Sequence, residues 1–335
     1  MMSQSKFSKK VFFRADGNSE IGLGHITRCL ALAEMIIEKF QCSFAVQTAD
    51  PTILDQISRI CSAKVLKDHN EKTFTNLLNG EEIVVLDGYH FGTDYQKTIK
   101  SKGSKLVCID DLHSIHFVAD VVINHSLKAS SDQYSREPYT TIYTGSKYML
   151  LRKEFFEASK KRRTSREFKK AFVCFGGSDQ QNLSLKIGEL LLKTEAISDV
   201  SILLGAAFKG ELEKLNSLDP CRVKIYHNAT ATQLIDIMQK SDFAVVSASA
   251  IAYECAAVGL PMITGYYVDH QVEFYKALLS QPNIVGADCL YYINLDKMNS
   301  AIRDLQNSYE PDAVNFVDAN QKSRYLQIFQ NLSTD

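Results

Sequence analysis

The chain has 335 residues, a formal net charge of −1, and a composition that is 45% hydrophobic and 23% charged. This length allows two domains of ordinary size, and the hydrophobic fraction excludes a disordered chain. The near-zero charge gives no electrostatic reason to expect nucleic acid or an anionic membrane surface as a partner.

The eight cysteines are scattered along the chain, and no two of them are spaced Cys-x-x-Cys. Several lie inside apolar, strand-like runs, a pattern typical of reduced and buried thiols. The first six residues lack the apolar core of a secretion signal, and no apolar run reaches membrane-spanning length. We therefore expect a cytoplasmic protein that does not insert into a membrane.

The first half of the chain is predicted to alternate strands with helices. Strands are expected over residues 11–13, 43–47, 64–67, 83–87, 105–111 and 118–124, and helices over 26–37, 52–60 and 71–78. This alternation is typical of parallel βαβ units, in which ligands bind outside the carboxyl ends of the strands. Polar residues expected at that edge are Asp16, Asp87, Tyr89, Asp110 and Asn124.

A glycine loop, Gly22-Leu23-Gly24-His25, joins the first strand to the first helix. Free amides and the helix dipole at such a junction favour an anionic ligand and disfavour imidazolium. We therefore expect His25 to be neutral near pH 7 and able to accept a proton. The spacing is not the dinucleotide fingerprint, because Arg28 stands where a third glycine is needed. A helix-start histidine without chemistry is the alternative interpretation.

Residues 150–166 are charged and predict a helical linker between an N-terminal domain, 1–150, and a C-terminal domain, 151–335. The basic run Lys160-Lys161-Arg162-Arg163 is interpreted as a solvated helix face rather than a polyanion site. Further strands are predicted over residues 168–175, 200–205, 223–227 and 243–247. The fold class is thus α/β, with two Rossmann-like, doubly wound parallel-sheet domains facing a cleft. The last helix can pack back on the N-terminal domain.

Two stretches of the second half follow predicted strand ends. Gly176-Gly177-Ser178-Asp179, before a helix that starts near Asn182, is a glycine turn that lets the backbone approach a ligand closely. Ser247-Ala248-Ser249 precedes another helix, with Glu254 about two turns into it. Small residues there would expose helix-start amides to a diphosphate, and Glu254 could accept hydrogen bonds from ribose hydroxyls. A well-formed turn and helix cap is the alternative for each stretch.

The sequence gives little support for a metal site or a catalytic nucleophile. Asp110, Asp111, His113 and His116 are near enough in sequence to ligate a divalent ion, but their spacing matches no standard signature. No Gly-x-Ser-x-Gly elbow or reactive-looking cysteine is present. We therefore expect neither a metal nor another cofactor.

Taken in order, the motifs resemble those of a known family. They are Arg14-x-Asp16, Gly22-x-Gly24-His25-x-x-Arg28, Asp87-Gly88-Tyr89, Asp110-Asp111, Tyr148-x-Leu150-Leu151-Arg152-x-Glu154-Phe155, Gly176-Gly177-Ser178-Asp179-x-x-Asn182, and Ser247-Ala248-Ser249 with Glu254. This set is similar to that of the UDP-2,4-diacetamido-2,4,6-trideoxy-β-L-altropyranose hydrolases of pseudaminic acid biosynthesis. The resemblance covers most of the chain and implies a GT-B-like fold, similar to the glycosyltransferase that adds N-acetylglucosamine to lipid-linked peptidoglycan precursors.

The resemblance implies metal-independent hydrolysis of a UDP-sugar at the anomeric carbon, with inversion and release of UDP. It makes His25, Tyr89 and Asp16 the catalytic group, with His25 deprotonating the attacking water. UDP is a leaving group of low pKa, so amide donors suffice to expel it. Residues implied to contact the substrate or UDP are Gly22, Gly24, Arg28, Asp87, Gly176, Gly177, Ser178, Asp179, Asn182, Ser247, Ser249, Glu254, His270 and Gln271.

One position departs from the family, which usually has Asn where this chain has His270. The departure leaves the exact sugar open and brings in a second possible base. A GT-B glycosyltransferase with a UDP-amino sugar donor and a non-catalytic nucleotide-sugar-binding protein are the alternatives. Because the first half has no amphipathic basic-aromatic patch for a lipid-linked acceptor, we predict a hydrolase of a small-molecule UDP-sugar rather than a transferase. We also expect the protein to be a monomer.

Overall fold

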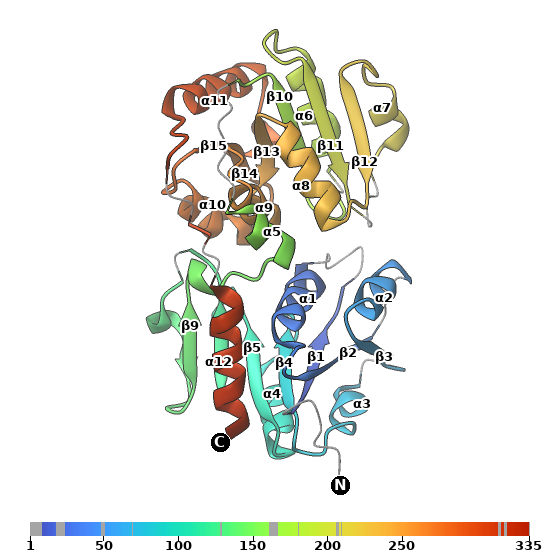
Figure 1. The fold of residues 1–335 in the computed structure, drawn as a ribbon, viewed down its shortest axis with the longest axis vertical. Coiled ribbons are helices and arrows are strands. Elements are labelled where there is room, and N and C mark those ends of the chain that lie inside the picture. Colours follow the sequence, from blue (N-terminus) through green and yellow to red (C-terminus); the bar gives the residue numbers. More distant parts are fainter. Residues whose placement is uncertain are drawn as a thin grey trace. The chain divides into compact units, whose positions relative to one another are not determined.

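The computed structural model describes residues 9–17, 24–47, 51–68, 70–127, 129–160, 167–179, 181–205, 208, 210–313, 316–317 and 320–334. The chain divides into two compact units. Unit 1 comprises Met1–Lys153 with Asn320–Asp335, and unit 2 comprises Glu154–Ala319. Each unit holds one large parallel β-sheet with helices packed against it (Figure 1).

Unit 1 is organised around a seven-stranded sheet of order β3-β2-β1-β4-β5-β7-β9, in which every pair of neighbours is parallel. The strands are β1 (Lys10–Ala15), β2 (Gln41–Val46), β3 (Ser62–Val65), β4 (Ile83–Asp87), β5 (Lys105–Ile109), β7 (Val121–Asn124) and β9 (Thr141–Thr144). A small separate pair is formed by β6 (His116–Phe117) and β8 (Ser135–Arg136). The central strand β4 is buried along its whole length, as its unbroken apolar sequence predicts for a strand covered on both faces.

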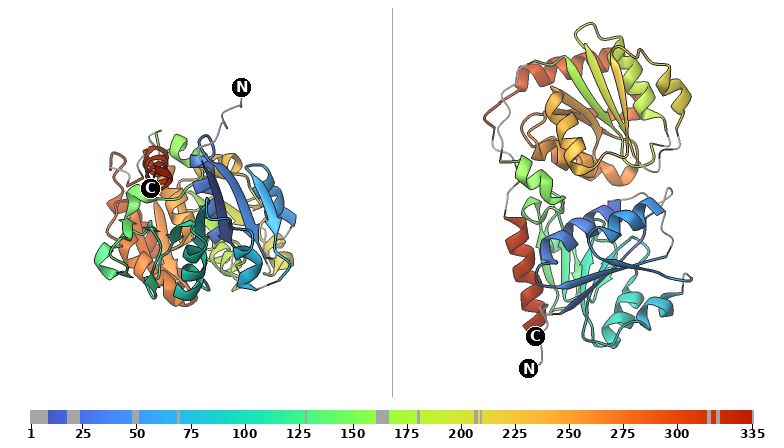
Figure 2. Two further views of the ribbon diagram at one scale, coloured as in Figure 1. Left: turned by 90° about the horizontal axis from the view of Figure 1, so that it is seen from below. Right: turned by 45° about the vertical axis from the view of Figure 1, so that its right-hand side comes forward.

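The helices of unit 1 are α1 (Gly24–Ile36), α2 (Pro51–Ser58), α3 (Glu71–Thr75), α4 (Thr93–Ser101) and, from the end of the chain, α12 (Gln321–Thr334). α12 packs against α1 and against the 3-10 turn Ser146–Tyr148. The rings of Phe40 and Phe329 lie 5.8 Å apart in this contact. The last helix therefore completes the core of unit 1, and the right-hand view of Figure 2 shows it running along this unit.

Unit 2 has a six-stranded parallel sheet of order β12-β11-β10-β13-β14-β15. Its strands are β10 (Lys170–Cys174), β11 (Asp199–Leu204), β12 (Val223–His227), β13 (Phe243–Ser247), β14 (Met262–Tyr266) and β15 (Ile284–Cys289). Its helices are α6 (Leu183–Leu192), α7 (Leu212–Asn216), α8 (Ala231–Lys240), α9 (Ala250–Ala257), α10 (Val272–Leu278) and α11 (Leu295–Ser308), preceded by α5 (Lys153–Ala158) at the boundary of the units. Thr230 and Gln233 form a capping box that starts α8.

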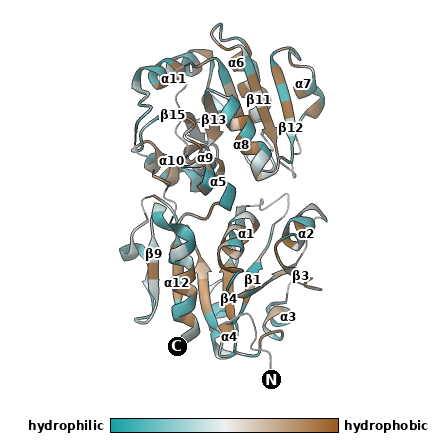
Figure 3. Ribbon diagram, viewed as in Figure 1, coloured by the Kyte–Doolittle hydropathy of each residue, from teal (hydrophilic) through white to brown (hydrophobic). Residues whose placement is uncertain are grey.

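The predicted fold class is confirmed, since both sheets are parallel and wound with helices. The strands of each unit are rich in hydrophobic residues, which are buried between the sheet and the helices that cover it (Figure 3). Among the described residues, no helix combines the length and the apolar character needed to cross a membrane.

Several predicted elements have other bounds in the structure: the strand expected over residues 105–111, for example, ends at Ile109, and the helix expected over 71–78 ends at Thr75. The strand expected over residues 118–124 begins only at Val121, because the amide of Val118 donates to the Gln96 side chain rather than to a neighbouring strand. Of the helical linker predicted over residues 150–166, Lys153–Ala158 forms α5 and a turn follows at 159–160. Residues 161–166 lie outside the described part of the chain.

The sheet order fixes where the polar strand ends of unit 1 lie. β1, β4, β5 and β7 are consecutive neighbours, and all run in the same direction. Asp16, Asp87, Asp110 and Asn124 therefore share the carboxyl edge of one sheet.

Candidate active site

Asp87, the last residue of β4, is the centre of a hydrogen-bonded cluster in unit 1. Its carboxylate is fully buried. Oδ1 accepts from His25 Nδ1 at 2.6 Å and from the Arg28 guanidinium at 2.6 Å, and Oδ2 accepts from Arg28 Nε at 2.6 Å. Burial by itself would raise the pKa of Asp87, but the charge of Arg28 and the hydrogen bonds from His25 and Arg28 hold it below its ordinary value. Asp87 is therefore a carboxylate ion.

His25 is the second residue of α1 and is 6% exposed. Because an ionised Asp87 can only accept hydrogen bonds, the 2.6 Å contact places the proton of a neutral imidazole on Nδ1. The Arg28 guanidinium, 3.1 Å from the same nitrogen, is then a neighbouring donor to Asp87 rather than a partner of His25. Among the described residues no group bonds Nε2, so this nitrogen presents a lone pair.

The periodicity of α1 brings these donors together. Arg28 and Cys29 follow His25 by three and four residues. The three side chains therefore lie on one face of α1, the face toward the end of β4. The thiol of Cys29 donates to Asp87 Oδ2 at 3.6 Å, and burial raises its pKa well above the ordinary value. Cys29 is thus a neutral donor that supports Asp87.

Tyr89 and Asp111 extend the cluster beyond Asp87. The Tyr89 ring meets the His25 ring edge-on, with centroids 4.7 Å apart, and its hydroxyl donates to Asp111 Oδ2 at 3.3 Å. Arg28 donates to the same oxygen at 2.8 Å. Burial would raise the pKa of Asp111, but the charge and hydrogen bond of Arg28 lower it. Tyr89 is 53% exposed, so the cluster opens on this side.

His125 joins this region although sequence reasoning did not single it out. It directly follows β7, and its Nδ1 accepts from the Leu150 amide at 3.3 Å. Burial and the charge of Arg28 lower its pKa to about 4, so its ring is neutral at pH 7. Its place after a strand of the same edge is the signal that could have found it.

Asp16 belongs to a second cluster at the end of β1. Its Oδ1 pairs with Arg14 at 2.7 Å and accepts from the Gln47 amide at 2.8 Å, and its Oδ2 lies 3.4 Å from His90 Nε2. Burial would raise the pKa of Asp16, but hydrogen bonds from His90 and Arg14 and the charge of Arg14 lower it strongly. The carboxylate of Asp16 thus bonds Arg14 and the Gln47 amide and lies near His90, and it does not bond His25.

Of the two loop glycines, Gly24 is the first residue of α1 and has open space around it, while Gly22 lies outside the described residues.

The side chains considered for a metal go to separate partners. Asp110 accepts from the Tyr134 hydroxyl at 3.0 Å and from the His113 amide at 2.7 Å, whereas His116 pairs with Ser135 and Glu137. In the part of the chain that the structure describes, no group of three or more His, Cys, Asp or Glu side chains is arranged to hold a metal ion.

The glycine turn of unit 2 follows β10 and is shaped by close backbone packing. Gly176 has φ +85°, and a Cβ on Gly205 would lie 2.5 Å from the Gly177 Cα. The backbone of Gly177 therefore packs tightly against the end of β11.

Asp179 and Asn182 complete the turn. The Asp179 carboxylate accepts from the Leu183 and Ser184 amides, both at 2.9 Å, and so caps α6. Asn182 Oδ1 accepts from the Glu211 amide at 2.7 Å. The structure thus shows both side chains holding the turn, and their contact with a ligand stays a prediction.

The serine stretch of unit 2 lies at the end of β13, next to β10. Ser247 and Ser249 place their hydroxyl oxygens 3.0 Å apart, and Ser249 stands at the N-terminus of α9 without capping it through its side chain. Glu254 is 7% exposed and is the fifth residue of α9, one turn into the helix rather than the predicted two.

His270 and Gln271 lie farther along the sheet, in the 3-10 turn Asp269–Gln271. His270 is exposed, whereas Gln271 is buried and accepts from the Tyr267 amide at 3.1 Å.

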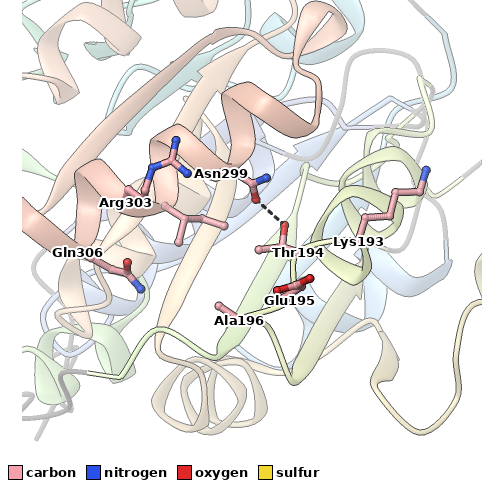
Figure 4. Close-up of a pocket in the computed structure, with 8 residues that line it drawn as sticks. Lys193, Thr194, Glu195, Ala196, Asn299, Arg303 and Gln306 are labelled. Carbon is pink, nitrogen blue, oxygen red and sulfur yellow. Dashed lines mark hydrogen bonds between the residues drawn. The ribbon is translucent and has the colours of Figure 1, made fainter.

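A hollow of about 370 Å³ lies elsewhere on unit 2, between the end of α6 and α11. Figure 4 shows Thr194 donating to Asn299 within it, at 3.0 Å. None of the predicted site residues lines this hollow.

Comparison with known proteins supports a relationship over most of the chain. An uncharacterized protein of Methanocaldococcus jannaschii is 28% identical over 288 residues, which cover 81% of this chain and 58% of that protein, so the chain spans little more than half of that relative. The UDP-2,4-diacetamido-2,4,6-trideoxy-β-L-altropyranose hydrolase of Campylobacter jejuni is 29% identical over 268 residues, 78% of this chain and 93% of that enzyme. The spore coat polysaccharide biosynthesis protein SpsG of Bacillus subtilis is 22% identical over 273 residues, 80% of each chain. No protein-family model matches the chain.

Solved structures share the two-unit architecture. MurG of Acinetobacter baumannii superimposes with a TM-score of 0.65 at 12% identity, covering 96% of this chain and 99% of that one. The co-structure of S. aureus MnaA with UDP gives a TM-score of 0.64 at 11% identity and covers 98% of each chain. The predicted resemblance to the UDP-sugar hydrolases and to the GT-B fold is therefore confirmed.

Proposed function

We propose that this homologue of the Campylobacter enzyme hydrolyses a UDP-linked 2,4-diacetamido-2,4,6-trideoxyhexose to UDP and the free sugar. The reaction is assigned to nonulosonic acid biosynthesis, of the pseudaminic acid type. The observation that carries the proposal is the 2.6 Å hydrogen bond between His25 Nδ1 and the buried carboxylate of Asp87. It leaves Nε2 as the nitrogen that can take a proton from water.

In the proposed mechanism, His25 is the general base. A water oxygen attacks the anomeric carbon of the hexose while its proton passes to His25 Nε2. The bond between the anomeric carbon and the β-phosphate oxygen breaks, and its electron pair leaves with UDP. Asp87 holds the imidazole in the required tautomer and stabilises the imidazolium that forms, as the carboxylate of a catalytic triad does. One displacement inverts the anomeric configuration.

Binding of UDP is assigned to unit 2. At the turn after β10, the space that a side chain on Gly176 would fill is open, so a phosphate can approach the backbone there. Ser247, Ser249 and the first amides of α9 can donate to the diphosphate. Glu254, one turn into the same helix, can accept from ribose hydroxyls. Expulsion of UDP then relies on these donors and needs little acid catalysis.

A glycosyltransferase is the second candidate, favoured by the likeness to MurG across nearly the whole chain. It would use the same base to activate an acceptor alcohol instead of water. The two activities differ in whether UDP is released without an acceptor.

The test is to incubate the protein with a panel of UDP-linked diacetamido-trideoxyhexoses in H₂¹⁸O, with EDTA and without acceptor. Equimolar UDP and free sugar from one member, with ¹⁸O on the anomeric hydroxyl and the inverted anomer formed first, is the expected result. Label in UDP would refute cleavage of the carbon–oxygen bond. UDP release only after an acceptor is added would favour the transferase, and UDP binding without turnover on any member would favour a binding protein.

A further inference from the structure

Asp111 is a second carboxylate beside the His25–Asp87 pair, and the proposed mechanism above gives it no role. The Arg28 guanidinium links the two groups: one amino nitrogen donates to Asp111 at 2.8 Å, while the other donates to Asp87 and lies 3.1 Å from His25 Nδ1. Tyr89 links them again, through its ring on His25 and its hydroxyl on Asp111. Asp111 is thus separated from the imidazole by a single side chain.

The charges of the cluster do not balance while His25 is neutral. Arg28 contributes one positive charge, whereas Asp87 and Asp111 each contribute one negative charge. Tyr89, Cys29 and His125, which also face this region, are uncharged at neutral pH, because burial raises the pKa of the first two and lowers that of His125. The neighbouring carboxyl of Asp110 interacts with Asp111, and burial raises its pKa. The net charge of −1 on Arg28, Asp87 and Asp111 is cancelled when His25 takes up a proton.

Hydrogen bonding compensates Asp111 less fully than Asp87. Both oxygens of Asp87 accept hydrogen bonds, but only Oδ2 of Asp111 does. Oδ1 of Asp111 is buried and has no donor within the described ranges. The negative charge of a buried carboxylate oxygen that accepts no hydrogen bond interacts more strongly with nearby charged groups.

We propose that Asp111 is a positioning residue that stabilises the imidazolium form of His25 through its charge. Asp87 is matched by Arg28 and sets the tautomer, whereas Asp111 supplies the surplus negative charge that makes Nε2 a stronger base. The inference rests on the proposed function for its catalytic meaning, but its electrostatic content can be measured separately.

The direct experiment is an NMR titration of the His25 imidazole in the unmodified protein and in Asp111→Asn. The amide can still accept from Arg28 but carries no charge, so the midpoint of the His25 titration should fall by about one pH unit. Asp111→Glu keeps the charge and should restore most of the midpoint. Asp110→Asn, which removes the adjacent carboxyl bonded to Tyr134 and the His113 amide, should move the midpoint much less. An unchanged midpoint in folded Asp111→Asn would overturn the inference.

The pH profile of UDP release gives the second readout. For the base to work it must be deprotonated, so the acidic limb of kcat/KM should move to lower pH in Asp111→Asn, with a lower plateau. A lower plateau with an unmoved limb would mean that Asp111 only supports Arg28 structurally, and would overturn the inference. If Asp111→Asn moves the titration midpoint but the unmodified protein releases no UDP from any sugar, the electrostatic role stands and the proposed function fails.

Discussion

Replacing Asp87 by Asn tests the central bond of the site. Asp87 accepts from His25, twice from Arg28, and from Cys29. An amide has only one accepting oxygen. If its NH₂ takes the place of Oδ1, Nδ1 of His25 must accept, and the ring proton moves to Nε2, where it blocks the base. In that orientation the NH₂ also opposes an amino nitrogen of Arg28. If its NH₂ takes the place of Oδ2 instead, it opposes Arg28 Nε in a fully buried position.

The magnitude follows from these contacts. In a serine-protease triad the same change lowers kcat about 10⁴-fold because the histidine takes the wrong tautomer. We expect a loss of about 10³–10⁴ in kcat/KM for Asp87→Asn, equivalent to about 4–5.5 kcal/mol of transition-state stabilisation. Breaking a buried ion pair costs about 3–5 kcal/mol of stability, and since Arg28 keeps Asp111 we expect the lower end of that range.

The assay is UDP release from the substrate identified in the panel, combined with thermal unfolding of each variant. Asp120→Asn is the matched control, because Asp120 is a largely buried carboxylate of unit 1 that accepts from Lys100 and the Leu106 amide, both at 2.7 Å, without touching a histidine. It should lose stability and keep kcat/KM. A folded Asp87→Asn whose kcat/KM stays within tenfold of the unmodified protein would refute the tautomer argument.

Three further substitutions test the base, the UDP site and the buried histidine after β7. His25→Ala should leave UDP affinity nearly intact and lower turnover at least about a hundredfold, the scale of a lost general base; unchanged turnover would remove His25 from that role. Glu254→Ala should weaken UDP binding measured by calorimetry, and unchanged affinity would leave Glu254 with a structural role only. The folded-state pKa of His125 is about 4 against an ordinary 6.5, so the unfolded chain binds the proton first as pH falls, and stability should decrease from pH 6.5 to 4. His125→Asn should flatten the thermal-unfolding profile in that window, and an equally steep profile would contradict the assignment.

Local sequence patterns were enough to predict the elements that carry the site. The unbroken apolar run over residues 83–87 predicted a buried strand ending in Asp87, and the structure has β4 over the same residues. The two glycines before an apolar-periodic segment predicted a helix over residues 26–37, directly after His25, and α1 spans Gly24–Ile36. Parallel strand direction then placed the polar strand ends on one edge of the sheet.

The bonding partners of those residues could not be read from local patterns. Arg28 donates to Asp87 and Asp111, which are 59 and 83 residues away in the chain, and its predicted contact with the substrate stays a prediction. The Asp179 carboxylate caps α6, and its predicted contact with UDP stays a prediction as well. His125 was not singled out at all. Periodicity and turn chemistry act over a few residues, whereas these contacts depend on strand register and helix rotation, which are fixed only when the sheet and its helices pack together.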